Sequence, residues 1–262
     1  MRFCSLASGS TGNSYFVGDH QGGLLVDCGL SARAIERQLA DGAGMTPEAL
    51  SGILVTHEHI DHIKGVGTLA RRYHLPVYAT RGTWDAMLDK IGAVPDEQQM
   101  VLPEDTDNLS IGRFDLEWFA TAHDAREPVA YVIHQNAQKV SIATDTGVLK
   151  PAMLGKLYDS DIIVVEANHD VEMLQRGRYP LYLKRRILGE LGHLSNDDCG
   201  HGLHEIIGSH TRHVVLAHLS QENNLPALAH QTVKEILLQG KLTGSLRLWV
   251  AKALEQSVTL DI

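Results

Sequence analysis

The sequence has few cysteines and no cysteine pattern typical of a disulfide-stabilised protein. Its 262 residues include three cysteines, Cys4, Cys28 and Cys199, and none of them belongs to a C-x-x-C pair. Such a sparse, odd-numbered set indicates a reducing compartment rather than a disulfide framework. A chain of this length buries roughly 70% of its unfolded surface, so a stable core needs no such cross-links.

Long apolar runs are also missing. No uninterrupted apolar stretch approaches the ~20 residues that span a bilayer. The first residues become polar and glycine-rich by Ser8, unlike the apolar core of a signal peptide. We therefore expect a cytoplasmic protein that makes no membrane contact.

Positive charge is in the minority. The sequence has 23 Lys and Arg residues against 32 Asp and Glu residues, a formal net charge of −9. This balance gives no support to a nucleic-acid partner. It does not exclude one, because bound divalent cations would reverse the sign of the charge where a polyanion would bind.

No Pro/Ser-rich linker, repeat or low-complexity tract divides the chain, so we expect one domain over residues 1–262. Short apolar runs alternate with amphipathic stretches. The expected strands are 3–6, 15–17, 24–26, 53–55, 77–79, 114–119, 129–133, 140–143, 162–165, 214–217 and 246–250. The expected helices are 32–39, 65–73, 83–91, 151–157, 180–188, 197–207 and 226–237. Each half consists of strands followed by β-α units, which predicts an α/β fold, a four-layer αββα sandwich with its site along one edge.

The most informative motif is H-x-H-x-D-H, formed by His57, His59, Asp61 and His62 directly after the apolar run 52–55. Neutral imidazole and carboxylate are ligands of zinc, manganese and iron. The motif differs from the H-E-x-x-H of zinc proteases, whose two histidines lie four apart on a helix. The alternative, a solvated polar turn, does not account for so dense a cluster.

Further ligand candidates follow other expected strands, namely His123, Asp145 and His218. Each alone has an ordinary explanation as a loop, core or turn residue. Because ligands in layered α/β folds gather at the carboxyl ends of strands, we expect them to converge. One metal would be held by His57, His59 and His123, a second by Asp61, His62 and His218, and Asp145 would bridge both. Asp27, after another strand, is expected to orient the ligand loop by hydrogen bonds.

These elements resemble those of the metallo-β-lactamase superfamily across the whole chain. Several flanking strings are similar to its YycJ/WalJ-type branch: LASGSTGNS at 6–14, HEHIDHIKGVG at 57–67, EANHD at 166–170, GHLSN at 192–196 and LAHLSQENN at 216–224. That branch is similar to bacterial 5′→3′ DNA exonucleases and, more distantly, to ribonuclease Z.

The resemblance to ribonuclease Z implies a role for Glu166 and His193 as a pair that donates a proton to the leaving oxygen. The alternative for His193 is a residue at a helix start, with Ser195 or Asn196 as the N-cap. Asp61 is expected to help orient a metal-bound hydroxide that attacks phosphorus. His169 is either a phosphate contact at the edge of the site or a solvated residue.

Residues 176–186 contain two tyrosines, no acid and five cations, which are Arg176, Arg178, Lys184, Arg185 and Arg186. Cations interleaved with aromatics suit phosphate contacts and base stacking, although a solvated helix face is the alternative. The loop 8–14 would offer N–H and hydroxyl groups to a phosphate, or it is a plain β-turn.

The sequence therefore predicts a metal-dependent phosphodiesterase with two divalent ions, zinc, manganese or iron. Its expected substrate is nucleic acid, DNA or RNA, and the resemblance implies the activity of a 5′→3′ DNA exonuclease. One alternative is a small-substrate metallohydrolase acting on a thioester, lactone or cyclic phosphodiester. The other is a non-hydrolytic member that binds nucleic acid or senses metal.

Overall fold

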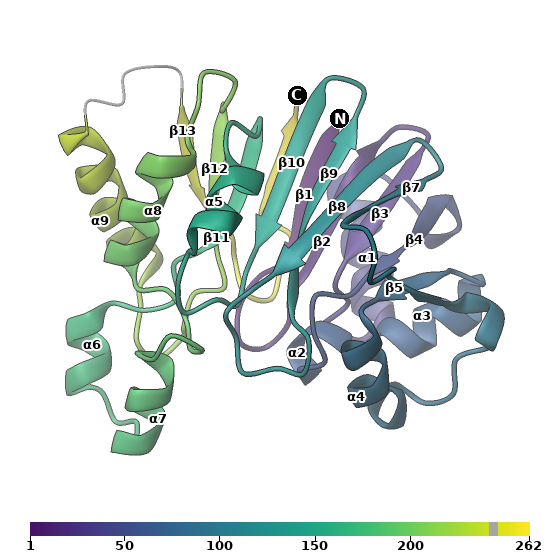
Figure 1. The fold of residues 1–262 in the computed structure, drawn as a ribbon, viewed down its shortest axis with the longest axis horizontal. Helices are drawn as coiled ribbons and strands as arrows, with labels where there is room; N and C mark the ends of the chain where they lie inside the picture. Colours follow the sequence, from purple (N-terminus) through teal and green to yellow (C-terminus); the bar gives the residue numbers. More distant parts are fainter. Residues whose placement is uncertain (241–245) are drawn as a thin grey trace.

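The computed structural model describes residues 1–240 and 246–262 and contains two seven-stranded sheets (Figure 1). The first sheet consists, in spatial order, of β14 (Val258–Asp261), β1 (Arg2–Ala7), β2 (Ser14–Asp19), β3 (Gly22–Val26), β4 (Leu50–Leu54), β5 (Val77–Ala79) and β6 (Gln99–Val101). The second consists of β13 (Arg247–Val250), β12 (His213–Ala217), β11 (Ile162–Glu166), β10 (Gln138–Ala143), β9 (Val129–Gln135), β8 (Phe114–Ala120) and β7 (Asn108–Ile111).

The helices are α1 (Ala32–Ala43), α2 (Ile60–Ile63), α3 (Val66–Tyr73), α4 (Arg81–Ile91), α5 (Pro151–Leu157), α6 (Val171–Arg176), α7 (Leu181–Ile187), α8 (Asn196–Ile206) and α9 (Pro226–Gln239). Short 3₁₀ turns occur at Pro47–Ala49 and Asp96–Gln98. None of the helices within the described residues combines the length and the apolar character needed to cross a membrane.

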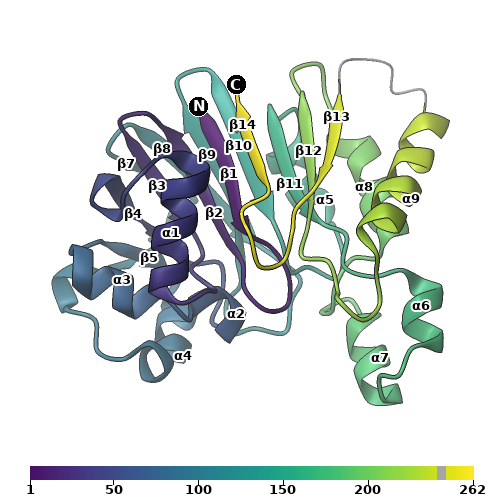
Figure 2. The same ribbon diagram turned by 180° about the vertical axis from the view of Figure 1, so that it is seen from behind.

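Three buried apolar clusters define the layers. One includes Ile35 and lies between the first sheet and helices α1, α3 and α4. A second joins the facing sides of the two sheets and includes Phe3 and Ile133. The third lies between the second sheet and helices α8 and α9, with Leu203 and Val233. Figure 2 shows α1 over the outer face of the first sheet. The order helix, sheet, sheet, helix confirms the predicted αββα fold.

Both sheets change from antiparallel to parallel pairing in the same way. Strands β1 to β3 and β7 to β10 pair antiparallel, whereas β3 to β6 and β10 to β13 pair parallel. The segments that follow parallel strands meet at one edge of a layered fold. Here that edge lies at the bottom of Figure 1.

Every expected strand and helix is present, although several ends differ. The strand expected over 53–55 is Leu50–Leu54, and the last one starts at Arg247 rather than 246. The helix expected over 32–39 continues to Ala43 and ends at Gly44, whose φ of 68° suits glycine. The helices expected from 65, 83, 180 and 197 begin instead at residues 66, 81, 181 and 196. The sequence missed β6, β7, β14, α2 and α6, which have three to six residues, too few for a visible period.

Candidate metal centre and nucleic-acid interface

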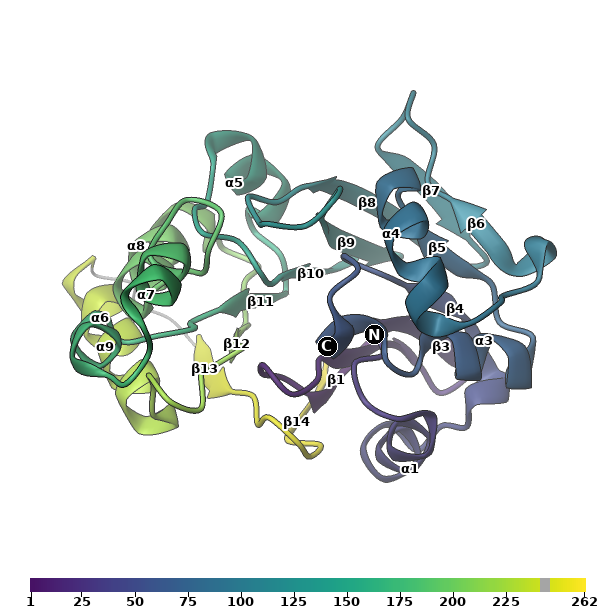
Figure 3. The same ribbon diagram turned by 90° about the horizontal axis from the view of Figure 1, so that it is seen from below.

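The residues predicted as metal ligands come together at the lower edge of the two sheets. His57, His59, Asp61 and His62 follow β4, and the other three follow β8, β10 and β12. Figure 3 looks onto this edge, with α6 and α7 on one side and α4 on the other. Because all of these segments leave the sheets at one edge, positions as distant as 57 and 218 share one site.

One group consists of three histidines. His59 Nδ1 lies 3.0 Å from His57 Nε2 and 3.2 Å from His123 Nε2. Suitable ligand atoms of these three rings all lie within 4.8 Å of one another. This spacing is compatible with one divalent ion bound by three imidazoles.

A second group consists of Asp61, His62 and His218. The Asp61 Oδ2 atom lies 3.5 Å from His62 Nε2 and 3.6 Å from His218 Nε2. Asp145 lies between the two groups, with Oδ2 3.3 Å from His62 Nε2 and Oδ1 3.8 Å from His123 Nε2. The predicted division into two triads with a shared carboxylate is therefore geometrically possible.

The chemistry of these side chains fits cations. Asp145 Oδ2 and His218 Nε2 are buried and lack a hydrogen-bond partner among the described residues. Burial alone would lower the pKa of His218, but Asp145, Asp61 and Glu166 outweigh it and raise that pKa to about 10. A buried site that stabilises positive charge so strongly suits divalent ions.

Asp27 is placed as predicted, beside the ligand loop. Its Oδ2 lies 2.7 Å from His62 Nδ1, so His62 Nε2 faces the other candidate ligands. Thr56 donates its backbone N–H to Asp27 Oδ1 and its hydroxyl to Oδ2, each at 2.8 Å. Thr56 was missed by the sequence analysis, although its position between strand and motif could have indicated it.

Three of the six non-glycine residues with positive φ among the described residues lie at this edge. Asp27, Asp145 and His218 have φ values of 59°, 58° and 52°, in the left-handed region that non-glycine residues rarely adopt. Each costs on the order of 1 kcal/mol, and such residues cluster at functional sites. Each follows the end of a strand, where the turn directs the side chain into the site.

Glu166 and His193 form the predicted pair. His193 Nδ1 lies 3.0 Å from Glu166 Oε2, while Thr146 N–H and Leu194 N–H donate to Oε1 at 2.6 and 3.2 Å. Burial would raise the pKa of Glu166, but His193 and His218 outweigh it and lower that pKa to about 2. The carboxylate is therefore ionised and fixed, and it orients the imidazole of His193.

Two alternatives can be compared with the neighbourhood of this pair. Ser195 is the N-cap of α8, with its side chain accepting the Asp198 N–H, as the helix-start alternative for His193 expects, and the contact of His193 with Glu166 is present as well. His169 is buried, and neither of its ring nitrogens has a partner among the described residues, so it is not a solvated side chain.

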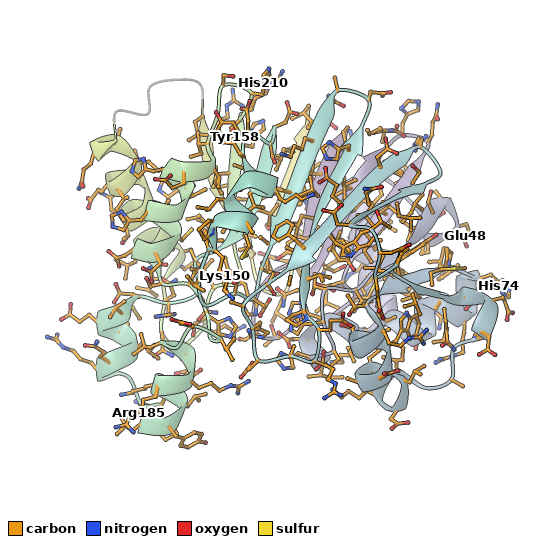
Figure 4. The ribbon with its side chains drawn as sticks, in the orientation of Figure 1. Glu48, His74, Lys150, Tyr158, Arg185 and His210 are labelled. Carbon is orange, nitrogen blue, oxygen red and sulfur yellow. The ribbon has the colours of Figure 1, made fainter. Side chains whose placement is uncertain are left out.

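The basic segment 176–186 forms the end of α6, a turn and α7, which extend below the sheets (Figure 1). No residue of α7 is buried, and Leu181 and Tyr182 are 62% and 75% exposed. Figure 4 places Arg185 on α7, away from the sheets. Tyr179, Leu183 and Arg186 line a pocket of about 180 Å³ that also touches His193 and His218.

The five cations of this segment are not equivalent. Arg176 pairs with Glu172 at 2.6 Å, and Arg186 pairs with Asp124. Lys184 Nζ donates to Gln175 O and Gly177 O, each at 2.7 Å, and so ties α7 to the end of α6. Arg178 and Arg185 are exposed and have no ion-pair partner among the residues described. The structure thus leaves two of the five predicted phosphate contacts unengaged within the chain.

Comparisons with known proteins agree with this fold. The family model of the β-lactamase superfamily domain matches residues 23–238. The chain is 46% identical over 237 residues to exodeoxyribonuclease YycJ of Bacillus anthracis, covering 90% of this chain and 89% of that protein. It is 42% identical over 243 residues to exodeoxyribonuclease WalJ of Streptococcus pneumoniae, covering 92% and 90% of the two chains. The crystal structure of the short form of human tRNase Z superposes with a TM-score of 0.66 at 14% identity, covering 100% and 99%, and shares the fold.

Proposed function

The chain belongs to the metal-dependent hydrolases of the β-lactamase superfamily and, within them, to the YycJ/WalJ-type nucleases. On this premise we propose that it is a 5′→3′ exonuclease that acts on DNA with two metal ions. The observation that carries the proposal is the meeting of seven imidazole and carboxylate side chains at one edge of a fold. Relatives of nearly the full length of this chain are named exodeoxyribonucleases, which supports DNA as the substrate.

In this proposal, His57, His59 and His123 hold one divalent ion, Asp61, His62 and His218 hold the other, and Asp145 serves both. Bound zinc, manganese or iron would supply a nucleophilic water ionised near neutral pH and positive charge for the phosphate oxygens. The side chains present suit all three metals.

The protein's own residues provide the remaining steps. Asp61 accepts a hydrogen bond from the attacking water and thereby orients it toward phosphorus. His193 gives a proton to the leaving oxygen, and the ionised Glu166, 3.0 Å from its Nδ1, orients the ring. Arg178 and Arg185 bind the strand beyond the cleaved bond, because their charges are exposed on the segment whose Tyr179, Leu183 and Arg186 line the pocket beside His193.

End-labelled substrates test the proposal. Single- and double-stranded DNA and RNA, labelled at the 5′ or the 3′ end, are incubated with the protein loaded with one metal at a time. We expect immediate release of the 5′ label from DNA as a mononucleotide, and a gradual shortening of 3′-labelled DNA. Asp145→Asn, purified in parallel, controls for contaminating nucleases because it removes the shared carboxylate charge.

Two outcomes would favour the alternatives. Hydrolysis of a thioester, lactone or cyclic phosphodiester without release from DNA would indicate a small-substrate hydrolase. Binding of DNA without hydrolysis at full metal load would indicate a non-hydrolytic member.

The organisation of residues 1–262 as one domain and the cytoplasmic location stay predictions.

A further inference from the structure

The loop that joins β1 to β2, residues 8–13, lies against the candidate metal centre. A β-turn closes it, with Gly12 N–H donating to Gly9 O at 3.0 Å, and Ser10 and Thr11 are exposed. The side chains of Ser8 and Asn13 are buried instead, with 1% and 0% exposure. These two side chains are therefore unavailable to a phosphate, whereas Ser10 and Thr11 are accessible to one, so both interpretations of the loop stay predictions.

Asn13 contacts the second triad directly. Its Oδ1 accepts the Gly9 N–H at 2.9 Å, and this fixes the orientation of the amide so that Nδ2 faces the site. The Nδ2 atom lies 3.1 Å from Gly9 O, 3.3 Å from Asp61 Oδ2 and 3.0 Å from His62 Nε2. If His62 Nε2 binds a cation, it no longer accepts a hydrogen bond. The two N–H groups of the Asn13 amide then donate to Gly9 O and Asp61 Oδ2.

Backbone hydrogen bonds also join Asn13 to the segment that contains Asp61. Asn13 N–H donates to Asp61 O at 2.8 Å, and Gly29 N–H donates to Asn13 O at 2.8 Å. A Cβ atom on Gly29 would lie 1.7 Å from Asp61 O, so only glycine permits this approach. The loop is therefore fixed against Asp61 by backbone as well as by side chain.

Ser8 holds the other end of the same triad. Its hydroxyl oxygen accepts the backbone N–H of His218 at 2.8 Å and lies 2.7 Å from Tyr15 Oη. Because His218 has a positive φ, its ring direction depends on how its backbone is held. No contact from Ser8 or Asn13 to His57, His59 or His123 is found among the described hydrogen bonds.

We propose that Ser8 and Asn13 are positioning residues for one of the two metal ions, the one assigned to Asp61, His62 and His218. The inference rests on the proposed two-metal function and adds that the loop determines the occupancy of one position only. Groups that orient ligands typically change metal affinity by about 10- to 100-fold when removed.

Metal titration of the full-length protein tests the inference. Metal-free wild type, Asn13→Ala and Ser8→Ala are titrated with Co²⁺, followed by visible absorption and by elemental analysis after dialysis. We expect two ions in the wild type. In each variant, one ion should bind as in the wild type and the other about 10- to 100-fold more weakly. Ser14→Ala is the matched control, since Ser14 Oγ is buried at the end of the same loop without a hydrogen-bond partner among the described residues.

Double variants identify which ion is affected. Asn13→Ala should weaken the single ion left in His59→Ala, and it should leave unchanged the single ion left in His218→Ala. Equal weakening of both ions, or unchanged binding of the second ion, would overturn the inference. A wild type that binds only one ion would refute the two-metal function itself, which is a different result.

Discussion

The proton-donating role proposed for His193 makes a sharp prediction for His193→Ala. His193 is not one of the seven proposed ligands, although with Asp145, Glu166 and His218 it forms a further group whose ligand atoms lie within 4.8 Å of one another; we expect both ions and the fold to be retained. Loss of a general acid should slow DNA cleavage by roughly 10²–10⁴-fold, which is about 3–5 kcal/mol in the activation barrier. Elemental analysis and thermal unfolding of the same preparation establish that metal and fold are intact.

The surroundings of Glu166 explain why His193 is the better residue to change. Glu166 Oε2 lies 3.0 Å from His193 Nδ1 but also 3.3 Å from His218 Nδ1. Glu166→Gln therefore removes support from the acid and from a candidate ligand together. It should slow cleavage less than His193→Ala while weakening metal binding, so the two effects need separate measurement.

The assay compares two leaving groups. A dinucleotide releases an alkoxide that needs a proton, whereas a nucleotide 4-nitrophenyl ester releases a phenolate that does not. His193→Ala should slow the first reaction strongly and the second much less. Equal losses on both substrates would refute acid catalysis and indicate that His193 positions the substrate.

Three further predictions concern other parts of the molecule. Asp27→Asn should weaken metal binding by about 10- to 100-fold because His62 loses its charged partner, and a chelator competition that gives wild-type affinity would contradict this. Arg178→Ala with Arg185→Ala should reduce the slope of log Kd against log salt by about one unit per lost phosphate contact, with a nitrophenyl ester as the unaffected control substrate. Burial lowers the pKa of His169 from 6.5 to about 4. The unfolded chain then binds more protons between these values, and stability should fall as the pH drops. In metal-free protein, wild type should lose about 1–2 kcal/mol more than His169→Gln between pH 7 and 5 in urea unfolding, and equal losses would contradict the assignment.

The sequence predicted the fold and the convergence of the candidate ligands because both depend on local patterns. His57 to His62 form a dense motif after an apolar run, and His123, Asp145 and His218 each follow another such run. Strand ends in a layered α/β fold meet at one edge, so the order along the chain was enough to predict proximity.

Contacts between distant segments were beyond the sequence. Ser8 meets His218 across 210 positions, and Asn13 meets Asp61 across 48, so neither pairing leaves a local pattern. The same reason applies to the basic segment, because a count of charges does not show which cations bind within the protein. Arg185 is exposed, whereas the ammonium group of Lys184 donates to two backbone carbonyls.

The position of β14 has a consequence for the second metal position. β14 pairs with β1, and the segment before it supports the loop 8–13, with Ser8 N–H donating to Lys252 O at 2.8 Å. The loop is thus held both through β1 and directly by Lys252. A substitution that loosens the pairing of β14 with β1 would therefore reach the second metal position through this loop.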